Sequence, residues 1–434
     1  MVGTGIFATT GILAAQLGDA RLILLCWSVG AVFALCGALS YSELGINFPS
    51  SGGEYVYLTR AYGPTWGFVT GWVSFFAGFS APIALAALAF ADYVGYFFPA
   101  FKQANAQFTI GSGALSLEFG GAQLLASGLI AVFTLLNCLG VGRTAKVQNV
   151  LTGTKLIVIA SFILLGFLAG SGEWAHFSQP AVRTSTLSIP VQFMISLLLI
   201  MVGYSGWNAA TYVAEELRQP ERTLPLALAT GTALVTALYL GLNLVFIYST
   251  PLESMKGVVA VGSLSASNLF GPQVAGVFAA LMAVSITSTV NAMVTIGPRV
   301  YYAMAKNSAF FSVAANVNPK WHTPVAAIVA QGVCSMLMTF TPFTQLMLYI
   351  GVCLTFFTVM SVASLFRFRR TRGWQRMAPV SFAFPLIPGA YIVVGVGMMI
   401  YGVIWQPKAS LTAAATIAAG AAVYHFAFAK RTES

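Results

Sequence analysis

Two glycine-rich stretches inside apolar segments are the parts of this chain best suited to bind a small polar molecule. One is GYSGWN at 203–208, within an apolar run over 189–214, and the other is GTGIF at 3–7. Glycine and serine disfavour a helix interior, and a helix interrupted inside a bilayer leaves backbone amides and carbonyls without partners. Such breaks are tolerated where the free groups face protein, water or a ligand, as in the interrupted helices of transporters. The two breaks therefore indicate a protein that moves a solute.

The composition requires a membrane protein. Of 434 residues, 58% are hydrophobic and 7% are charged, whereas an ordinary soluble domain has about 25% charged residues. Apolar runs of about 20 residues, long enough to cross a bilayer, recur along the chain. They predict an all-α integral membrane protein with twelve spans, at 1–17, 22–41, 66–98, 121–140, 150–169, 189–213, 225–249, 272–303, 323–341, 344–366, 380–405 and 409–429.

The positive charges predict the orientation of these spans. With both termini in the cytoplasm, the inner loops contain fifteen lysines and arginines and the outer loops contain five. This asymmetry is the usual one for membrane proteins, and it accounts for the net charge of +10 without a nucleic-acid partner. We expect a multi-pass protein of the plasma membrane, most simply a bacterial inner membrane, with the lipid bilayer around it.

Cysteines and histidines give no sign of a metal site, a cofactor or an enzyme. The five cysteines all lie in predicted spans and form no CxxC pair, and the three histidines are isolated. We therefore expect no disulfide framework, no metal, no cofactor and no catalytic residues.

The two breaks lie five apolar runs apart, in the first and the sixth. This spacing predicts a single transport domain over 1–434, made of one repeat at 1–169, an inverted repeat at 189–366 and two appended spans at 380–429. Inverted repeats of this kind place the solute site near the midplane, between the broken helices.

Five motifs in this order resemble the amino acid–polyamine–organocation (APC) superfamily, and more narrowly its L-type amino acid transporter branch and the bacterial relatives of that branch. They are GTGIF at 3–7, YSELGINFPSSGGEYVYLTRAYGP at 41–64, QNVLTGTK at 148–155, GYSGWNAATYVAEELRQPERTLP at 203–225, and Asn291 followed by RVYYAMA at 299–305. The resemblance covers the whole chain. It implies the leucine-transporter fold with broken spans 1 and 6, an α-amino acid substrate and alternating access.

The start of the chain departs from the family pattern. In the family, the first span begins well before the glycine motif, whereas here Met1 stands two residues before Gly3. We therefore expect span 1 to be truncated, and a transport-dead member of the family stays an alternative.

The breaks can together recognise the zwitterion of an amino acid. Amides at the start of the helix after the first break suit a carboxylate, and carbonyls at the second break suit an ammonium group. The expected substrate-binding residues are Gly3, Thr4, Gly5, Ile6, Val202, Gly203, Tyr204 and Ser205. The alternative for the glycines is a kink that serves helix packing. Val202 stands where the family often has an aromatic gate.

Lys155 is a lysine that the predicted boundaries place inside a span, which by default marks a functional site. In the resembling branch, a lysine of span 5 takes the place of the cation that bridges spans 1 and 8, so Lys155 would act as a tethered cation and transport would need no sodium. A buried lysine can also release its proton, which would couple transport to protons. Ser288 and Thr289 of span 8 are its expected partners. The alternative is a lysine that reaches the headgroups.

Other residues are candidates for gates or for substrate choice. Trp207, Glu216 and Arg222 are candidate gate residues near the inner loop after span 6. Since Asp92 is expected near the outer end of span 3, no acid lies at the midplane to pair with a cationic substrate. A neutral amino acid is therefore the first expectation, and a cationic amino acid or polyamine is the alternative. The loop over 100–120 lacks a cysteine, so we expect no disulfide-linked heavy-chain partner and a monomer.

Overall fold

Long apolar helices make up nearly all of the computed structural model, which describes residues 2–49, 52–111, 116–140, 142–306 and 309–429. Within these ranges, nine helices are long and apolar enough to cross a membrane. Three shorter apolar helices accompany them: α1 (Thr4–Leu17), α8 (Ile189–Tyr204) and α13 (Val325–Met338). The all-α membrane class is confirmed, while the count of twelve spans stays a prediction.

The first part of the chain contains the helices that follow α1. They are α2 (Ala20–Asn47), α3 (Glu54–Tyr62), α4 (Pro64–Val73), α5 (Ala81–Val94), α6 (Gly121–Cys138) and α7 (Gly142–Leu168). The π-helix η1 (Ser74–Ser80) joins α4 and α5 into one span over 64–94. Between α5 and α6, the 3₁₀ turns η2 (Pro99–Phe101) and η3 (Gln103–Asn105) precede a small antiparallel hairpin of β1 (Phe108–Ile110) and β2 (Leu117–Phe119).

The second part of the chain begins with α8. Its further helices are α9 (Pro220–Ser249), α10 (Leu252–Met255), α11 (Val261–Phe270), α12 (Pro272–Lys306) and α14 (Phe343–Phe368), and then α15 (Ala378–Phe382), α16 (Leu386–Trp405) and α17 (Pro407–Ala427). The 3₁₀ turns are η5 (Trp174–Ser178), η6 (Ala209–Glu216) and η7 (Ser312–Ala315).

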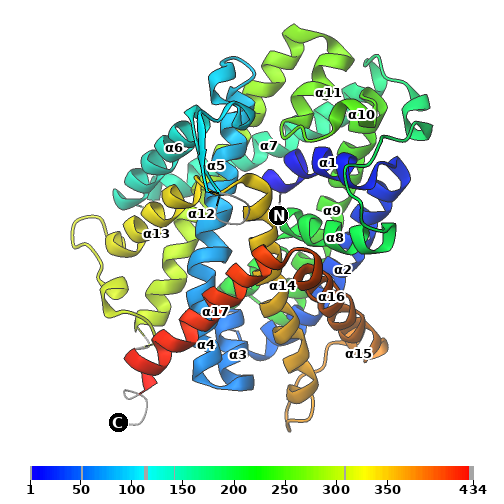
Figure 1. Cartoon of the computed structure of the whole chain (residues 1–434). Helices are drawn as coiled ribbons and strands as arrows, with labels where there is room; N and C mark the ends of the chain where they lie inside the picture. The colour runs from blue at the N-terminus through cyan, green and yellow to red at the C-terminus, as the bar shows by residue number, and fades with distance from the viewer. Residues whose placement is uncertain (1, 50–51, 112–115, 141, 307–308, 430–434) are drawn as a thin grey trace.

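The two parts match element by element. Each has short helices between its second and third spans: α3 in the first part, α10 and α11 in the second. Figure 1 shows α3 at the opposite end of the bundle from α10 and α11. The corresponding spans also pack against each other, α1 on α8, α2 on α9, α5 on α12 and α6 on α13. These pairings support the proposal of an inverted repeat.

Small side chains at the centre of the bundle let its helices approach closely. In α5 the stretch from Ala81 to Ala89 is buried throughout, and α5 packs on α12. The outer helices instead expose large apolar side chains, such as Leu168 at 81% and Phe426 at 84% exposure. Exposure of this kind is expected where a helix faces hydrocarbon instead of protein.

Two helix ends differ from the predicted spans. The second span continues to Asn47, beyond the predicted end at 41, and α9 begins at Pro220, before the predicted start at 225. Proline is favoured in the first turn of a helix because its missing amide would lack a partner there anyway. Glu43 and Arg222 are therefore helical residues and not loop residues.

Candidate functional site

The first break lies directly before α1. Gly3 is extended, with φ −142° and ψ −157°, and the helix begins at Thr4 without a side-chain cap. The first amides of a helix have no partner within it and carry partial positive charge. Thr4, Gly5 and Ile6 thus form the first turn, and all three are buried.

The second break follows α8. The helix ends at Tyr204, Ser205 turns to φ −53° and ψ 145°, and Gly206 adopts φ 87°, a conformation that favours glycine. The chain then continues as the 3₁₀ turn η6. Gly203 and Tyr204, which the sequence placed in the unwound part, are the last helical residues. Their carbonyls still lack helical partners because a helix leaves its last four carbonyls free.

The two breaks meet at their glycines. A methyl group added at Gly5 would overlap the Cα of Gly203 and approach its backbone nitrogen to 2.7 Å. The backbone of α1 therefore lies directly on that of α8, where α1 begins and α8 ends. Of the predicted substrate-binding residues, Val202 is also buried beside this contact, at 7% exposure.

Three aromatic side chains surround the end of α8. Trp27 of α2 lies with its ring centroid 5.7 Å from Tyr204 and 5.3 Å from Tyr239 of α9. The Tyr239 hydroxyl donates a hydrogen bond of 2.8 Å to the Gly203 carbonyl, so that acceptor already has a protein donor. Sequence reasoning missed Trp27 and Tyr239. The available signal was a tyrosine in mid-span, whose hydroxyl must find a partner when buried.

Trp207 lies apart from this aromatic group. Its ring centroid is 4.8 Å from that of Tyr41 and 6.1 Å from that of Tyr391, on the side of α2 and α16. Arg222 is exposed in the first turn of α9, and the Glu216 side chain lies outside the described residues. Among the described side chains, Trp207 and Arg222 make no ring contact, hydrogen bond or ion pair with each other.

Lys155 joins the first break to α12. Its Nζ donates hydrogen bonds to the Val2 carbonyl at 3.0 Å and to the Thr289 hydroxyl at 2.9 Å, and the residue is 5% exposed. Because α7 begins at Gly142, Lys155 lies well inside the helix, and both of these hydrogen bonds are to protein groups. The Ser288 hydroxyl instead donates to the Ser285 carbonyl at 2.8 Å within α12.

A second polar group ties α6, α7 and α12 together nearby. The Asn291 amide donates to Gln148 Oε1 at 3.0 Å and accepts from the Asn137 amide at 3.3 Å. Asn137 also accepts a 2.8 Å bond from the Thr295 hydroxyl. A satisfied buried network of this kind fixes the rotation of α12 and thereby the direction in which Thr289 points.

The buried carboxylate of Glu54 accepts a hydrogen bond from a residue that follows the second break. Glu54, at the start of α3, accepts hydrogen bonds from Tyr41 at 2.8 Å and from Asn208 at 2.9 Å. Burial raises the pKa of the Glu54 carboxyl from its ordinary value of 4.5, because the charged form loses solvation. The start of α3 is therefore tied to Asn208, which follows the end of α8.

An ion pair missed by sequence reasoning fastens α2 to the end of α14. Arg369 donates to Glu43 through two nitrogens, Nε to Oε1 at 2.7 Å and Nη2 to Oε2 at 2.5 Å. The Glu43 carboxylate also accepts hydrogen bonds from Trp374 Nε1 at 2.8 Å and from the Met377 amide at 3.1 Å. The Glu43 side chain is fully buried, so this pair has the hydrogen bonds that a buried charge needs.

Comparison with known proteins agrees with this geometry. A family model described as amino acid permease matches residues 1–428. The chain belongs to the amino acid permease family. Membership in this family implies the leucine-transporter-like fold, which fits the two broken helices and the paired spans described above.

Individual relatives support the resemblance to the L-type amino acid transporter branch. The chain is 30% identical to the serine/threonine exchanger SteT of Bacillus subtilis, over 91% of this chain and 87% of the relative. It is 27% identical to the large neutral amino acids transporter small subunit 2 of Mus musculus, covering 98% and 77%. It is 28% identical to the b(0,+)-type amino acid transporter 1 of Mus musculus, covering 94% and 80%. These relatives are transporters, and this chain resembles them along nearly its whole length.

Proposed function

We propose that this chain transports neutral α-amino acids by alternating access, without sodium. The observation that carries the proposal is the position of Lys155, whose ammonium group bridges the carbonyl before the first break and a hydroxyl of α12. A resident cation at this junction supplies the positive charge that a bound ion would otherwise supply. Transport then has no requirement for sodium.

The substrate would lie between the two breaks. The amides at the start of α1 are suited to the substrate carboxylate. The carbonyls at the end of α8, of which that of Gly203 accepts from Tyr239, are suited to its ammonium group. In the present geometry Gly5 and Gly203 touch, so the helices must separate to admit a ligand. Separation of broken helices is the motion that alternating access requires.

A neutral substrate is the better supported class. The one acidic residue of α5, Asp92, bonds through its carboxylate to the Gln103 amide at 3.1 Å, away from the breaks. The named relatives include an exchanger of serine and threonine and a transporter of large neutral amino acids. The b(0,+)-type relative keeps a cationic amino acid as the second candidate substrate.

The cellular setting is part of the same proposal. The distribution of lysine and arginine favours cytoplasmic termini in a plasma membrane, such as a bacterial inner membrane. The cysteine-free stretch over 100–120 argues against a disulfide-linked partner there, so we propose that the chain acts as a monomer. It would work as an exchanger or with protons, and the experiment below separates these two modes.

Uptake of labelled alanine into proteoliposomes tests the proposal. Vesicles are compared with and without internal unlabelled amino acids, sodium and a pH gradient. We expect uptake that needs no sodium and is competed by unlabelled neutral amino acids. Dependence on internal amino acid indicates exchange, and dependence on the pH gradient indicates proton coupling. A strict sodium requirement would refute the tethered-cation role, and competition by arginine or putrescine but not alanine would reassign the substrate.

A further inference from the structure

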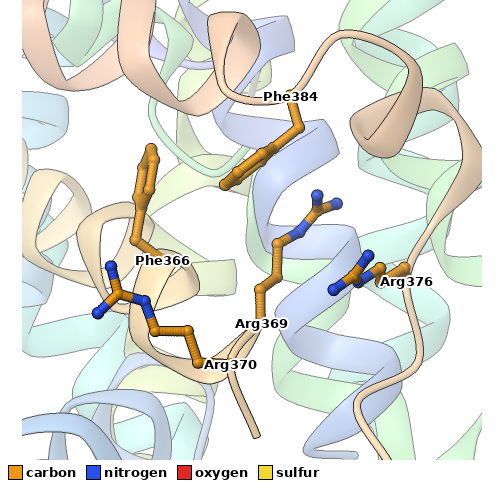
Figure 2. Close-up of a pocket in the computed structure, with 5 residues that line it drawn as sticks. All are labelled: Phe366, Arg369, Arg370, Arg376 and Phe384. Carbon is orange, nitrogen blue, oxygen red and sulfur yellow. The ribbon is translucent and has the colours of Figure 1, made fainter.

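Three arginines and two phenylalanines line a cavity between the end of α14 and the start of α16. Its volume is about 240 Å³, and its lining residues are Phe366, Arg369, Arg370, Arg376 and Phe384. Figure 2 shows Arg369 between Arg370 and Arg376, with the two phenylalanine rings on one side of them. The segment over 367–376 contains five arginines and no acidic residue.

The arginines of the cavity are not equivalent. Arg369 is paired with Glu43, and its guanidinium lies 4.2 Å from the centroid of the Phe384 ring. Arg370 and Arg376 are exposed, and no carboxylate among the described side chains lies within ion-pair distance of either. Two positive charges at this cavity are therefore not neutralised by the described protein groups. Guanidinium groups match the geometry of phosphate oxygens and bind them through paired hydrogen bonds.

We propose that this cavity binds the phosphate group of an anionic lipid. Phe382 is 95% exposed and Leu386 is 73% exposed, and both lie where the chain enters α16, a helix long and apolar enough to cross the membrane. Acyl chains can therefore lie along α16 while the phosphate reaches Arg370 and Arg376. The cavity is smaller than the roughly 300–1,000 Å³ of pockets that enclose a whole drug-sized ligand, which suits a headgroup.

Membrane topology alone does not explain this arrangement. Positive charges favour one side of the bilayer wherever they stand in a loop, and that preference requires neither a cavity nor aromatic walls. Basic pockets between membrane helices are, in contrast, a recurrent form of anionic headgroup site. Binding of a phosphate group at this cavity does not depend on which amino acid is transported.

The test is a lipid titration of the purified full chain in detergent, followed by native mass spectrometry. Phosphatidylglycerol is compared with phosphatidylcholine, with glycerol 3-phosphate and with a decamer of glutamate. The variant Arg370→Gln/Arg376→Gln is compared with Arg218→Gln/Arg372→Gln, which removes the same charge from exposed arginines outside the cavity. Both single variants, Arg370→Gln and Arg376→Gln, are measured as well, in case the double variant does not fold.

We expect phosphatidylglycerol to bind the parent and the control variant alike. At about 1 kcal/mol per cation, the loss of both arginines should weaken binding roughly 30-fold, and each single change should weaken it about fivefold. Equal weakening in the control would show a diffuse charge effect and overturn the site. Equal binding of phosphatidylcholine would also overturn it. Stronger binding of glycerol 3-phosphate or of the acidic peptide would reassign the cavity to a soluble phosphate or to a protein partner.

Discussion

Gly5 and Gly203 meet backbone to backbone, so the first turn of α1 rests on the last turn of α8 with no room for a side chain. A methyl group at position 5 must displace backbone atoms, which cannot rotate aside as the end of a side chain does. We expect Gly5→Ala to lower the free energy of unfolding by about 1–3 kcal/mol, measured by thermal unfolding in detergent.

Two other glycines provide controls for this change. Gly128 of α6 and Gly153 of α7 have open space where a methyl would be added. Since alanine is favoured over glycine in a helix, Gly128→Ala and Gly153→Ala should leave stability unchanged or raise it. If Gly5→Ala behaves as they do, the contact between the breaks is not tight.

At the second break, Gly203→Leu should abolish substrate binding. A side chain at this position meets the Trp27 ring, which lies 3.1 Å from the position of an added Cβ. Binding is measured by scintillation proximity with labelled amino acid. Unchanged affinity would mean that the break is only a kink for helix packing.

Removal of the Lys155 ammonium group should stop transport. Lys155→Ala removes the positive charge and leaves the Val2 carbonyl without its donor, whereas the protein should still insert because α7 stays apolar. Thr289→Val removes one partner and keeps the charge. A hydrogen bond to a charged group is worth about 1.5–3 kcal/mol, so we expect at least a tenfold slower uptake in this variant.

Lys320→Ala is the control for the Lys155 variants. Lys320 lies in an exposed turn outside the membrane helices, and its loss should leave uptake unchanged. A normal uptake rate in Lys155→Ala, with protein present in the vesicles at the parent level, would rule out the tethered-cation role.

The buried carboxylate of Glu54 should make stability depend on pH. Because the pKa of the folded state is raised above 4.5, the folded protein holds a proton that the unfolded chain releases. Stability is then greatest below pH 4.5 and falls as the pH rises through the folded pKa. Glu54→Gln should remove this decline, as judged by unfolding temperature against pH. The exposed Glu221→Gln should preserve it, and a decline that persists in Glu54→Gln would have to come from another group.

The Glu43–Arg369 pair should respond differently to single and double changes. Arg369→Met leaves a buried carboxylate without its counter-ion, at a cost of about 3–5 kcal/mol. The double variant Glu43→Met/Arg369→Met removes both charges and should recover much of that loss. Unfolding temperatures of the four proteins form a double-mutant cycle, and strictly additive effects would show that the pair is not coupled.

The sequence was sufficient for features that depend on local composition. Apolar length identified the membrane class, and the glycine clusters located both breaks to within a few residues. Lys155 was identifiable because a charge in an apolar run is rare. Thr289 and Ser288 could not be told apart in this way, since adjacent residues of a helix point about 100° apart and a small error in helix phase exchanges them.

Contacts between segments far apart in the chain could not be predicted from the sequence. Arg369 and Glu43 are 326 positions apart, and nothing near either residue indicates the other. Glu43 was also assigned to a loop because the predicted span ended at 41. Tyr239 and Trp27 lie on helices whose relative rotation is fixed only by packing, so their approach to Gly203 required the three-dimensional structure.

The covalent attachment of Lys155 limits the work that the proposed carrier can perform. A travelling sodium ion adds about 2.3 kcal/mol to each cycle for every 100 mV of membrane potential, and a charge fixed to a helix carries none of this energy across. The ratio of substrate inside and outside is then set by the gradient of a counter-substrate or of protons. In sealed vesicles that have neither gradient, the carrier should bring its substrate to equal concentrations on both sides and no further.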